Sequence, residues 1–251
     1  MSEKKYAIVG LIRGHRDLKK YNSLIKRNNL LHTNFNYKYN YDVIIFHEGN
    51  INVEQQKYIS EKSAGSENIK FINIADSWKK LEGKGYNKMC RFYSETIYNY
   101  LQEYTYVLRL DDDSYINQHI DYDIFTFMEE KGYDYGYIRR KVDGHSLTSE
   151  TFVPFCNNYF KKNVKPMHNF YNNFSLLKIE FFNKKEVRNF MNKVIKSNGI
   201  VKYRWGDSNI QAVCVKEFSS KNKIHLFDDI KYAHGSHGYK NYPNARHEWS
   251  W

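Results

Sequence analysis

The stretch Tyr106-Val107-Leu108-Arg109-Leu110-Asp111-Asp112-Asp113 decides the fold of this chain. Its first five residues are mostly apolar, which is typical of a β-strand buried on both faces of a sheet. Three adjacent carboxylates follow at the carboxyl end of this strand, where open α/β sheets bind their ligands. The pattern therefore predicts a central strand that ends in a functional site.

The spacing of two of these carboxylates suggests a metal site. Asp111 and Asp113 are two residues apart, so in an extended chain their side chains leave on the same side. Together they could hold one Mn²⁺ or Mg²⁺ ion and leave room for phosphate oxygens. An ordinary Asp-rich turn or a helix cap after the strand is the alternative interpretation.

Length and composition indicate one globular domain, residues 1–251. The hydrophobic fraction of 41% and the charged fraction of 27% exclude a disordered chain. The formal net charge of +11 suits an anionic partner such as a nucleotide diphosphate, nucleic acid or a membrane surface. No arginine-rich tract or zinc-finger spacing is present, so we do not expect nucleic acid binding.

The three cysteines, Cys90, Cys156 and Cys214, show no close pair that would clip a metal, and their odd number argues against a fully paired disulfide framework. No apolar run is long enough to span a membrane, and no signal peptide precedes the first predicted strand. We therefore expect a soluble, cytoplasmic protein, with a location in the Golgi lumen only if an N-terminal anchor has been removed.

Apolar periodicity predicts alternating strands and helices. Strands are expected at 6–12, 42–47, 69–74, 106–110, 135–139, 174–179 and 224–227. Helices are expected up to residue 31 and at 53–62, 87–101, 124–130, 184–196 and 208–217. Residues 141–149 suggest a loop, Pro154 limits where a helix in 152–165 could start, and the chain after 228 shows little periodicity. This alternation predicts an α/β fold with a single Rossmann-like mixed sheet flanked by helices.

Five motifs in order resemble a known family. They are Tyr86-Asn87-Lys88-Met89-Cys90-Arg91-Phe92, Arg109-Leu110-Asp111-Asp112-Asp113, Asn172-Asn173-Phe174-Ser175, Arg204-Trp205-Gly206-Asp207, and the run from Ile224 to His234. The series is similar to the fungal α-1,2-mannosyltransferases, glycosyltransferase family 15, over residues 6–234. The resemblance implies a GT-A fold and retaining transfer of mannose from GDP-mannose with Mn²⁺.

The resemblance also assigns metal ligands. The family carries Arg-Val-Glu-Pro-Asp where this chain has residues 109–113, so Asp111 stands in place of a Glu and Asp113 matches the Asp. His234 matches the terminal histidine of the last family motif and is implied as a further ligand, and imidazole beside carboxylates suits Mn²⁺. A structural role for His234 is the alternative.

Donor-binding residues are expected ahead of and around the central strand. Tyr86 and Arg91 resemble a donor-binding pair of the family, and Arg13 lies in the loop 11–17 expected to select the base. The planar guanidinium of Arg109 suits phosphate or ribose oxygens. Its alternative is an ion pair with Asp111 or Asp113.

One position departs from the family. Ser175 stands where the family has its proposed nucleophile, a Glu, and a hydroxyl is a poor substitute for a carboxylate in forming a glycosyl-enzyme. Front-face displacement, another acid, or lost or altered catalysis would each explain the change. Asp207 is the best alternative carboxylate and is expected near the acceptor, or else caps the helix that follows.

These features predict a metal-dependent retaining glycosyltransferase that transfers mannose from GDP-mannose to a glycan or glycoprotein hydroxyl. A GT-A transferase with another donor, such as a UDP-sugar, is one alternative. A non-catalytic nucleotide- or glycan-binding module is another, which Ser175 favours.

Overall fold

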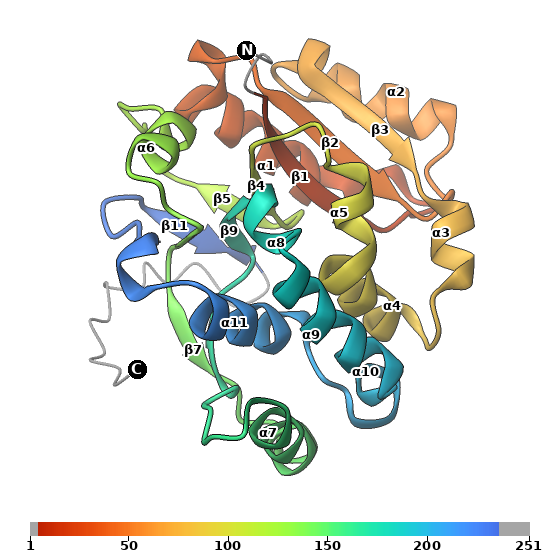
Figure 1. The fold of residues 1–251 in the computed structure, drawn as a ribbon. Helices are drawn as coiled ribbons and strands as arrows, with labels where there is room; N and C mark the ends of the chain where they lie inside the picture. The colour runs from red at the N-terminus through yellow and green to blue at the C-terminus, as the bar shows by residue number, and fades with distance from the viewer. Residues whose placement is uncertain (1–4, 236–251) are drawn as a thin grey trace.

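Seven strands form the central sheet of the computed structural model, which describes residues 5–235. Their order across the sheet is β10-β6-β9-β4-β1-β2-β3 (Figure 1). The strands are β1 (Tyr6–Ile12), β2 (Asp42–His47), β3 (Ile69–Asn73), β4 (Tyr106–Leu110), β6 (Tyr135–Tyr137), β9 (Phe174–Lys178) and β10 (Ile224–Leu226). The strand that precedes the three aspartates, β4, lies in the middle of the sheet with all of its residues buried, as its apolar run predicts.

One strand, β9, makes the sheet mixed. β9 runs antiparallel to its neighbours β4 and β6, whereas the other neighbouring pairs are parallel. Arg109 on β4 pairs with Ser175 on β9. Because the two strands run in opposite directions, the residues just before β9 lie at the same edge of the sheet as the residues just after β4.

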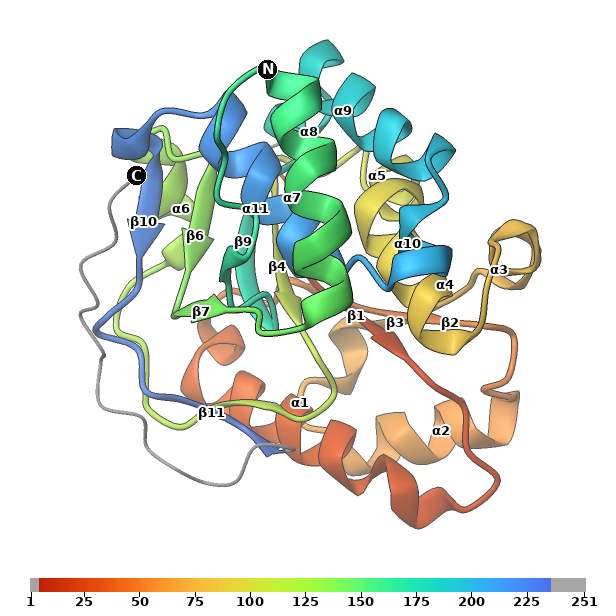
Figure 2. The same cartoon turned by 90° about the horizontal axis from the view of Figure 1, so that it is seen from below.

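Helices cover both faces of the sheet (Figure 2). One face carries α1 (Asn22–Asn34), α2 (Val53–Lys62) and α6 (Ile124–Glu130), and the other carries α4 (Gly85–Arg91), α5 (Ile97–Tyr100), α7 (Ser146–Phe160), α8 (Ile179–Phe182), α9 (Lys185–Lys196), α10 (Gly199–Tyr203) and α11 (Asp207–Phe218). Successive residues of β1 face opposite ways: Ile8 packs with Leu31 of α1, and Ala7 and Val9 pack with Phe92 and Val213. The predicted α/β fold is confirmed.

Shorter elements connect these layers. They are α3 (Ala75–Lys80), the 3₁₀ turns Leu18–Tyr21, Asn36–Lys38, Ser66–Asn68 and Lys221–Lys223, and a π-helical turn, Phe92–Thr96, between α4 and α5. The predicted helix 87–101 therefore exists, but a wider turn interrupts it. Apolar spacing of four residues fits both kinds of turn, so the sequence does not separate them.

The region from residue 140 to 165 differs from the sequence prediction. Instead of a loop over 141–149 the chain forms β7 (Arg140–Val142) and begins α7 at Ser146. Pro154 lies inside α7, where we expected it to limit the start of a helix. The helix continues past the exposed proline because Phe152 and Cys156, on either side of it, are buried in the core.

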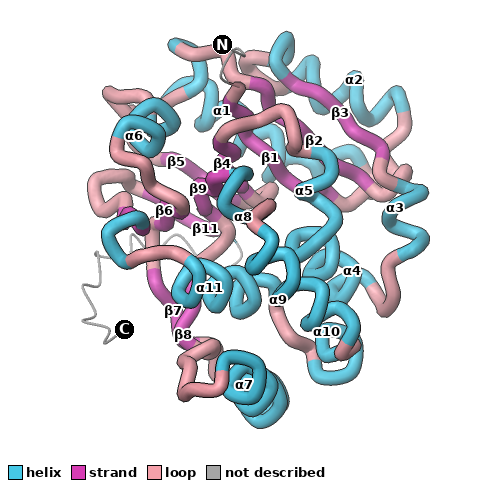
Figure 3. Tube along the Cα trace, in the orientation of Figure 1, coloured by secondary structure: helices cyan, strands magenta, loops and turns pink. Residues whose placement is uncertain are grey.

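Two small antiparallel sheets complete the fold (Figure 3). β7 pairs with β8 (His168–Phe170), and β5 (Ser114–Ile116) pairs with β11 (Tyr232–His234). The sequence did not predict β11, since three residues are too few to show a period. Within residues 5–235, no helix combines the length and the apolar character that a membrane span requires.

Candidate active site

The predicted site residues come from four parts of the chain. Asp111 follows β4, Asn173 precedes the antiparallel β9, Asp207 begins α11, and His234 ends β11. The pairing of β11 with β5 sets His234 opposite Ser114, directly after the three aspartates. Because these elements meet at one edge of the central sheet, their polar side chains form one connected group.

Arg109 and Asp207 form the buried centre of this group. Arg109 Nη1 lies 2.5 Å from Asp207 Oδ2, and the two side chains are 3% and 6% exposed. Arg109 Nε also donates to Asp111 Oδ1 at 3.3 Å, and Asn172 Nδ2 donates to Asp207 Oδ2 at 2.7 Å. Burial opposes the charge of Arg109, but Asp111, Asp207 and Tyr93 together raise its pKa well above the ordinary value. The charge pair is therefore fully formed and closely held.

An aromatic ring supports the guanidinium from the other side. The Arg109 guanidinium carbon lies 3.4 Å from the centre of the Tyr93 ring. Tyr93 belongs to the π-helical turn, and its hydroxyl accepts a hydrogen bond from the backbone N–H of Leu11 at 2.9 Å. The wider turn thus places a tyrosine between β1 and β4, where it fixes the arginine by a cation–π contact.

Asp111, Asp113 and His234 are linked through one amide. Asn173 Nδ2 donates to Asp111 Oδ2 at 2.6 Å and lies 2.7 Å from His234 Nε2. His234 Nε2 is in turn 2.9 Å from Asp113 Oδ1. Among residues 5–235, no group of three His, Cys, Asp or Glu side chains is arranged as a metal shell. Two carboxylates and an imidazole suit Mn²⁺, and an ion that also binds diphosphate oxygens needs only a few protein ligands, so the donor set fits.

A third carboxylate has a buried counter-charge. Arg27 on α1 is fully buried, and its guanidinium nitrogens make no hydrogen bond with any residue between 5 and 235. Burial lowers the pKa of Arg27 to about 10, while Asp112, Tyr93 and Asp111 favour its charged form. Burial and the neighbours Asp113 and Asp111 raise the pKa of Asp112, and Arg27 opposes that rise. Arg27 therefore stabilises the negative charges of the acidic turn, Asp111 to Asp113, by electrostatic attraction and not by hydrogen bonds.

Tyr86, which the resemblance implies as a donor-binding residue, lies close to Asp207 of the buried charge pair. Its side chain is 41% exposed, and the Arg204 guanidinium lies 4.4 Å from the centre of its ring. Behind it, Cys90 Sγ donates to Asp207 Oδ1 at 3.6 Å. Burial, together with Cys90 and Asp207, raises the pKa of the Tyr86 hydroxyl above its ordinary value. Tyr86 is thus partly exposed beside the buried pair, with the Arg204 guanidinium over its ring.

The structure does not bring two predicted donor-binding residues into this network. Arg91 forms ion pairs with Glu82 and Glu95, at 4.0 and 3.5 Å. Arg13 is exposed beyond the end of β1, and its charge acts on Glu48 at the end of β2. Arg13 thus lies at the same edge of the sheet, which is compatible with donor binding, whereas Arg91 supports the local helix.

The two candidate catalytic residues are both enclosed. Ser175 is 0% exposed and donates to the backbone carbonyl of Asn172 at 3.5 Å. Asp207 is 4% exposed and occupies the first helical position of α11, where Gly206 is the cap, so the alternative interpretation of Asp207 as a helix cap is wrong. Its carboxylate accepts hydrogen bonds from Arg109 and Asn172 instead of from the backbone N–H groups that a helix cap would bind.

Sequence reasoning gave no role to Asn173, Tyr93 or Arg27. The motif that contains Asn173 was recognised, but its bridging role depends on the antiparallel direction of β9, which a strand pattern alone does not reveal. The sequence shows Tyr93 and Arg27 only as residues within predicted helices. The one available signal was the charge of Arg27 amid the apolar positions of the first helix.

Comparison with known proteins supports the resemblance stated above. The family model described as glycolipid 2-alpha-mannosyltransferase matches residues 77–169 and 149–250. O-glycoside alpha-1,2-mannosyltransferase omh1 of Schizosaccharomyces pombe is 24% identical over 261 aligned residues, covering 87% of this chain and 67% of the relative. The chain spans only 42% to 45% of the length of three other fungal relatives that it matches.

Solved structures share the architecture. The mannosyltransferase Ktr4p of Saccharomyces cerevisiae superposes with a TM-score of 0.78 at 22% identity, over 93% of this chain and 71% of Ktr4p. Core-mannan synthase A of Aspergillus fumigatus, in an Mn/GDP form, gives a TM-score of 0.75 at 19% identity, over 93% of this chain and 75% of the synthase. The predicted GT-A fold is confirmed. Since the family model covers more than half of the chain, the protein belongs to the glycolipid 2-alpha-mannosyltransferase family.

Proposed function

We propose that this chain is a metal-dependent, retaining glycosyltransferase that transfers mannose from GDP-mannose to a hydroxyl of a glycan or glycoprotein. The observation that carries the proposal is the connected group Asp111–Asn173–His234–Asp113 at the carboxyl edge of β4. An enzyme of this family needs such a group, because the diphosphate leaving group carries charge that must be neutralised. We also propose that residues 1–251 act as one catalytic domain, since both halves of the sheet contribute to the site.

The metal ligands would be Asp111, Asp113 and His234. A bound Mn²⁺ or Mg²⁺ would supply Lewis-acid stabilisation of the leaving diphosphate. Asn173 orients Asp111 and His234 through hydrogen bonds, and Gly235 N donates to the backbone carbonyl of Asp113 at 2.8 Å. The side-chain contacts keep Asp111, Asp113 and His234 close together, and a bound ion would replace the contacts made by the atoms that ligate it.

Arg109 and Asp207 would keep the reaction centre rigid and charged. Arg109 fixes one oxygen of Asp111 while its own charge is offset by Asp207. Tyr86, which is partly exposed, would contact the donor together with Arg204 over its ring, and Arg13 would reach the donor from the end of β1. The enclosed Ser175 is poorly placed for a covalent intermediate, which favours a front-face route in which the acceptor attacks as the diphosphate leaves.

A donor screen tests the proposal. Purified protein is incubated with GDP-mannose and with UDP-sugars, with and without Mn²⁺, and hydrolysis of each donor is measured. We expect Mn²⁺-dependent release of GDP from GDP-mannose. Release of UDP instead would replace the donor in this proposal, and tight GDP binding with no hydrolysis or transfer would support a binding module.

The compartment and the acceptor are separate questions. The cytoplasmic location stays a prediction from the sequence, and fractionation of cells that express the tagged protein would test it. Transfer to a panel of mannosylated glycans would identify the acceptor.

A further inference from the structure

Two arginines approach the acidic turn from opposite faces of the central sheet. Arg109 contacts the π-helical turn and α11 on one face, whereas Arg27 belongs to α1 on the other (Figure 2). A Cβ added at Gly10 of β1 would lie 3.6 Å from Arg27 Nη2 and 2.7 Å from the carbonyl oxygen of Leu110. Leu110 is the last residue of β4 before the turn. The Arg27 guanidinium therefore lies beside the entry to the acidic turn, and the proposed function gives it no role.

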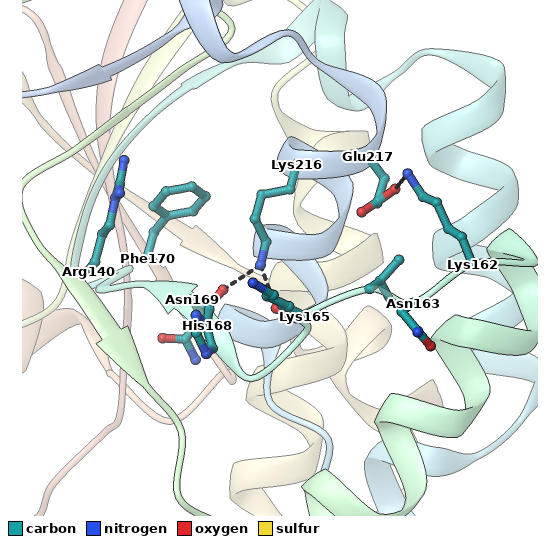
Figure 4. A pocket seen from close by; sticks show the side chains of 10 residues that line it. Arg140, Lys162, Asn163, Lys165, His168, Asn169, Phe170, Lys216 and Glu217 are labelled. Carbon is teal, nitrogen blue, oxygen red and sulfur yellow. Dashed lines mark hydrogen bonds and ion pairs between the residues drawn. The ribbon is translucent and has the colours of Figure 1, made fainter. Parts of the chain in front are cut away.

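Arg27 lacks the hydrogen bonds that hold another partly buried cation, Lys216. Lys216 lines the cavity beside β8, and its Nζ donates to the carbonyls of Lys165 and His168 at 2.6 and 2.7 Å (Figure 4). Arg27 is 0% exposed, and none of its three guanidinium nitrogens has an acceptor among residues 5–235. A buried charged group without hydrogen bonds is costly, so the charges around Arg27 must offset that cost.

The main counter-charge of Arg27 is the middle carboxylate of the turn. Burial lowers the pKa of Arg27, and Asp112 opposes this effect more strongly than Tyr93 or Asp111 does. The attraction is effective because little water lies between buried groups to screen it. Asp112 is therefore drawn toward the face of the sheet that carries α1.

The two neighbours of Asp112 are engaged elsewhere. Asp111 Oδ2 accepts a hydrogen bond from Asn173 Nδ2 at 2.6 Å, and Asp113 Oδ1 lies 2.9 Å from His234 Nε2. These contacts lie on the side where the proposed metal ligands meet. The three consecutive carboxylates are thus divided between the metal site and Arg27.

A third carboxylate beside the metal site would compete with the donor. Mn²⁺ commonly takes about six ligands, and every position that the protein fills is lost to the diphosphate oxygens. The related motif Arg-Val-Glu-Pro-Asp has a proline at this position, which offers no side-chain ligand. Asp112 adds a ligand directly between Asp111 and Asp113, so this chain needs a means of keeping it away from the ion.

We propose that Arg27 is a positioning residue of the metal site, which holds Asp112 away from the ion and leaves coordination positions open to the diphosphate. The inference rests on the proposed function, because it requires the metal ligands Asp111, Asp113 and His234. Arg27 is suited to this role because burial in α1 fixes its charge in place before any ion or donor binds. An arginine that only filled space would affect stability and leave metal affinity unchanged.

The variant Arg27→Met tests this role, since methionine is a long apolar side chain without charge. It should bind Mn²⁺ alone roughly tenfold more tightly than the wild type, because Asp112 then joins the metal shell. It should also bind GDP more weakly at saturating Mn²⁺, because a diphosphate position is filled. The double variant Arg27→Met/Asp112→Asn should return both affinities to the wild-type values. The paramagnetic resonance signal of free Mn²⁺ measures the first affinity and calorimetry the second, on the full chain.

Two further variants serve as controls. Arg188→Met makes the same substitution at a partly buried arginine of α9, on the opposite face, and should leave both affinities unchanged. Asp112→Asn, which keeps Arg27, should bind Mn²⁺ and GDP like the wild type. This variant keeps the inference testable if Arg27→Met does not fold, since a loss as large as that of Asp113→Asn would make Asp112 a ligand and overturn the inference.

The remaining outcomes separate this inference from the proposed function. Equal or weaker Mn²⁺ binding by Arg27→Met would overturn the role of Arg27, and so would failure of the added Asp112→Asn to reverse the change. In both cases the wild type still binds Mn²⁺ and GDP, and the proposed function stands. A wild type that binds no Mn²⁺, with or without GDP, would overturn the proposed metal site and this inference with it.

Discussion

The positive charge of Arg109 is buried, and neighbouring side chains compensate it. Asp207 and Asp111 accept its hydrogen bonds, and Tyr93 covers one face of the guanidinium. Removing one partner of such a buried pair costs about 3–5 kcal/mol, because the other charge is left without compensation. The same residue thus links the stability of the fold to the position of Asp111.

The first prediction concerns the metal ligands. Asp113→Asn should weaken Mn²⁺-dependent binding of GDP by roughly a hundredfold, because an amide is a poorer ligand for a hard cation. His234→Ala should also weaken Mn²⁺ binding more than it lowers thermal stability. Calorimetry with GDP and Mn²⁺ measures the affinities. Asp121→Asn is the matched control, since that side chain is 88% exposed. Wild-type affinity in Asp113→Asn would remove this residue from the site.

The second prediction separates Asp207 from Ser175. Asp207→Asn should lower the transfer rate roughly a hundredfold or more, since Arg109 loses its charge partner and would no longer hold Asp111 in place. Ser175→Ala should keep most of the activity, because the hydroxyl is enclosed and its bond to the Asn172 carbonyl is long, at 3.5 Å. Rates are compared at saturating donor. An inactive Ser175→Ala beside an active Asp207→Asn would return the nucleophile role to position 175.

At the scale of elements, the direction of β9 assembles the site. Because β9 is antiparallel to β4, Asn172 and Asn173 precede it at the edge where Asp111 leaves the sheet. A parallel strand in this place would carry these two amides to the opposite edge. The amide links to Asp207 and His234 would then be lost.

The third prediction concerns α7. Pro154 lacks the N–H that would bond to the carbonyl of Glu150, yet it lies at an exposed position inside the helix. Pro154→Ala should therefore raise the free energy of unfolding, by up to about 3 kcal/mol. Urea unfolding measures it, with Glu150→Ala on the same exposed surface as the control. A loss of stability in Pro154→Ala would contradict the expected cost of the proline.

How much of these elements the sequence predicts depends on their length and burial. The apolar run 42–47 was placed with the observed bounds, because a strand buried in a parallel sheet has an unmistakable composition. The strands of the two small sheets, β5, β7, β8 and β11, were missed, since each is a three-residue segment with little apolar character outside the central sheet. The proposed metal ligands, Asp111, Asp113 and His234, come from motifs and stay a prediction, whereas the bridging position of Asn173 needed the strand pairing.

At the scale of the whole molecule, buried tyrosines and cysteines make the free energy of unfolding depend on pH. Burial, the first cause in each case, raises the pKa of Tyr98, Cys90 and Cys214 above their ordinary values. The unfolded chain therefore loses these protons first as pH rises, and the folded state binds more protons above pH 9 to 10.

The fourth prediction follows from this difference in proton binding between the folded and unfolded states. The free energy of unfolding should fall steadily as pH rises above about 9, the ordinary pKa range of cysteine and tyrosine. Urea midpoints at pH 7 to 11 measure the trend. Tyr98→Phe should reduce the fall, since the Tyr98 hydroxyl is buried without a hydrogen-bond partner, whereas Tyr37→Phe, at a position 44% exposed, should not. A flat profile up to pH 11 would contradict the burial of these groups.

The buried Arg27 has a consequence for which substitutions this sequence can accept during evolution. The related motif Arg-Val-Glu-Pro-Asp has a proline where this chain has Asp112, and Arg27 faces that added carboxylate. Each residue offsets a cost of the other: without Arg27 the three adjacent carboxylates lose a buried counter-charge, and without Asp112 the buried Arg27 has less compensation. The two positions should therefore be inherited together, and descendants of this chain that regain an uncharged residue at 112 should also lose the arginine at 27.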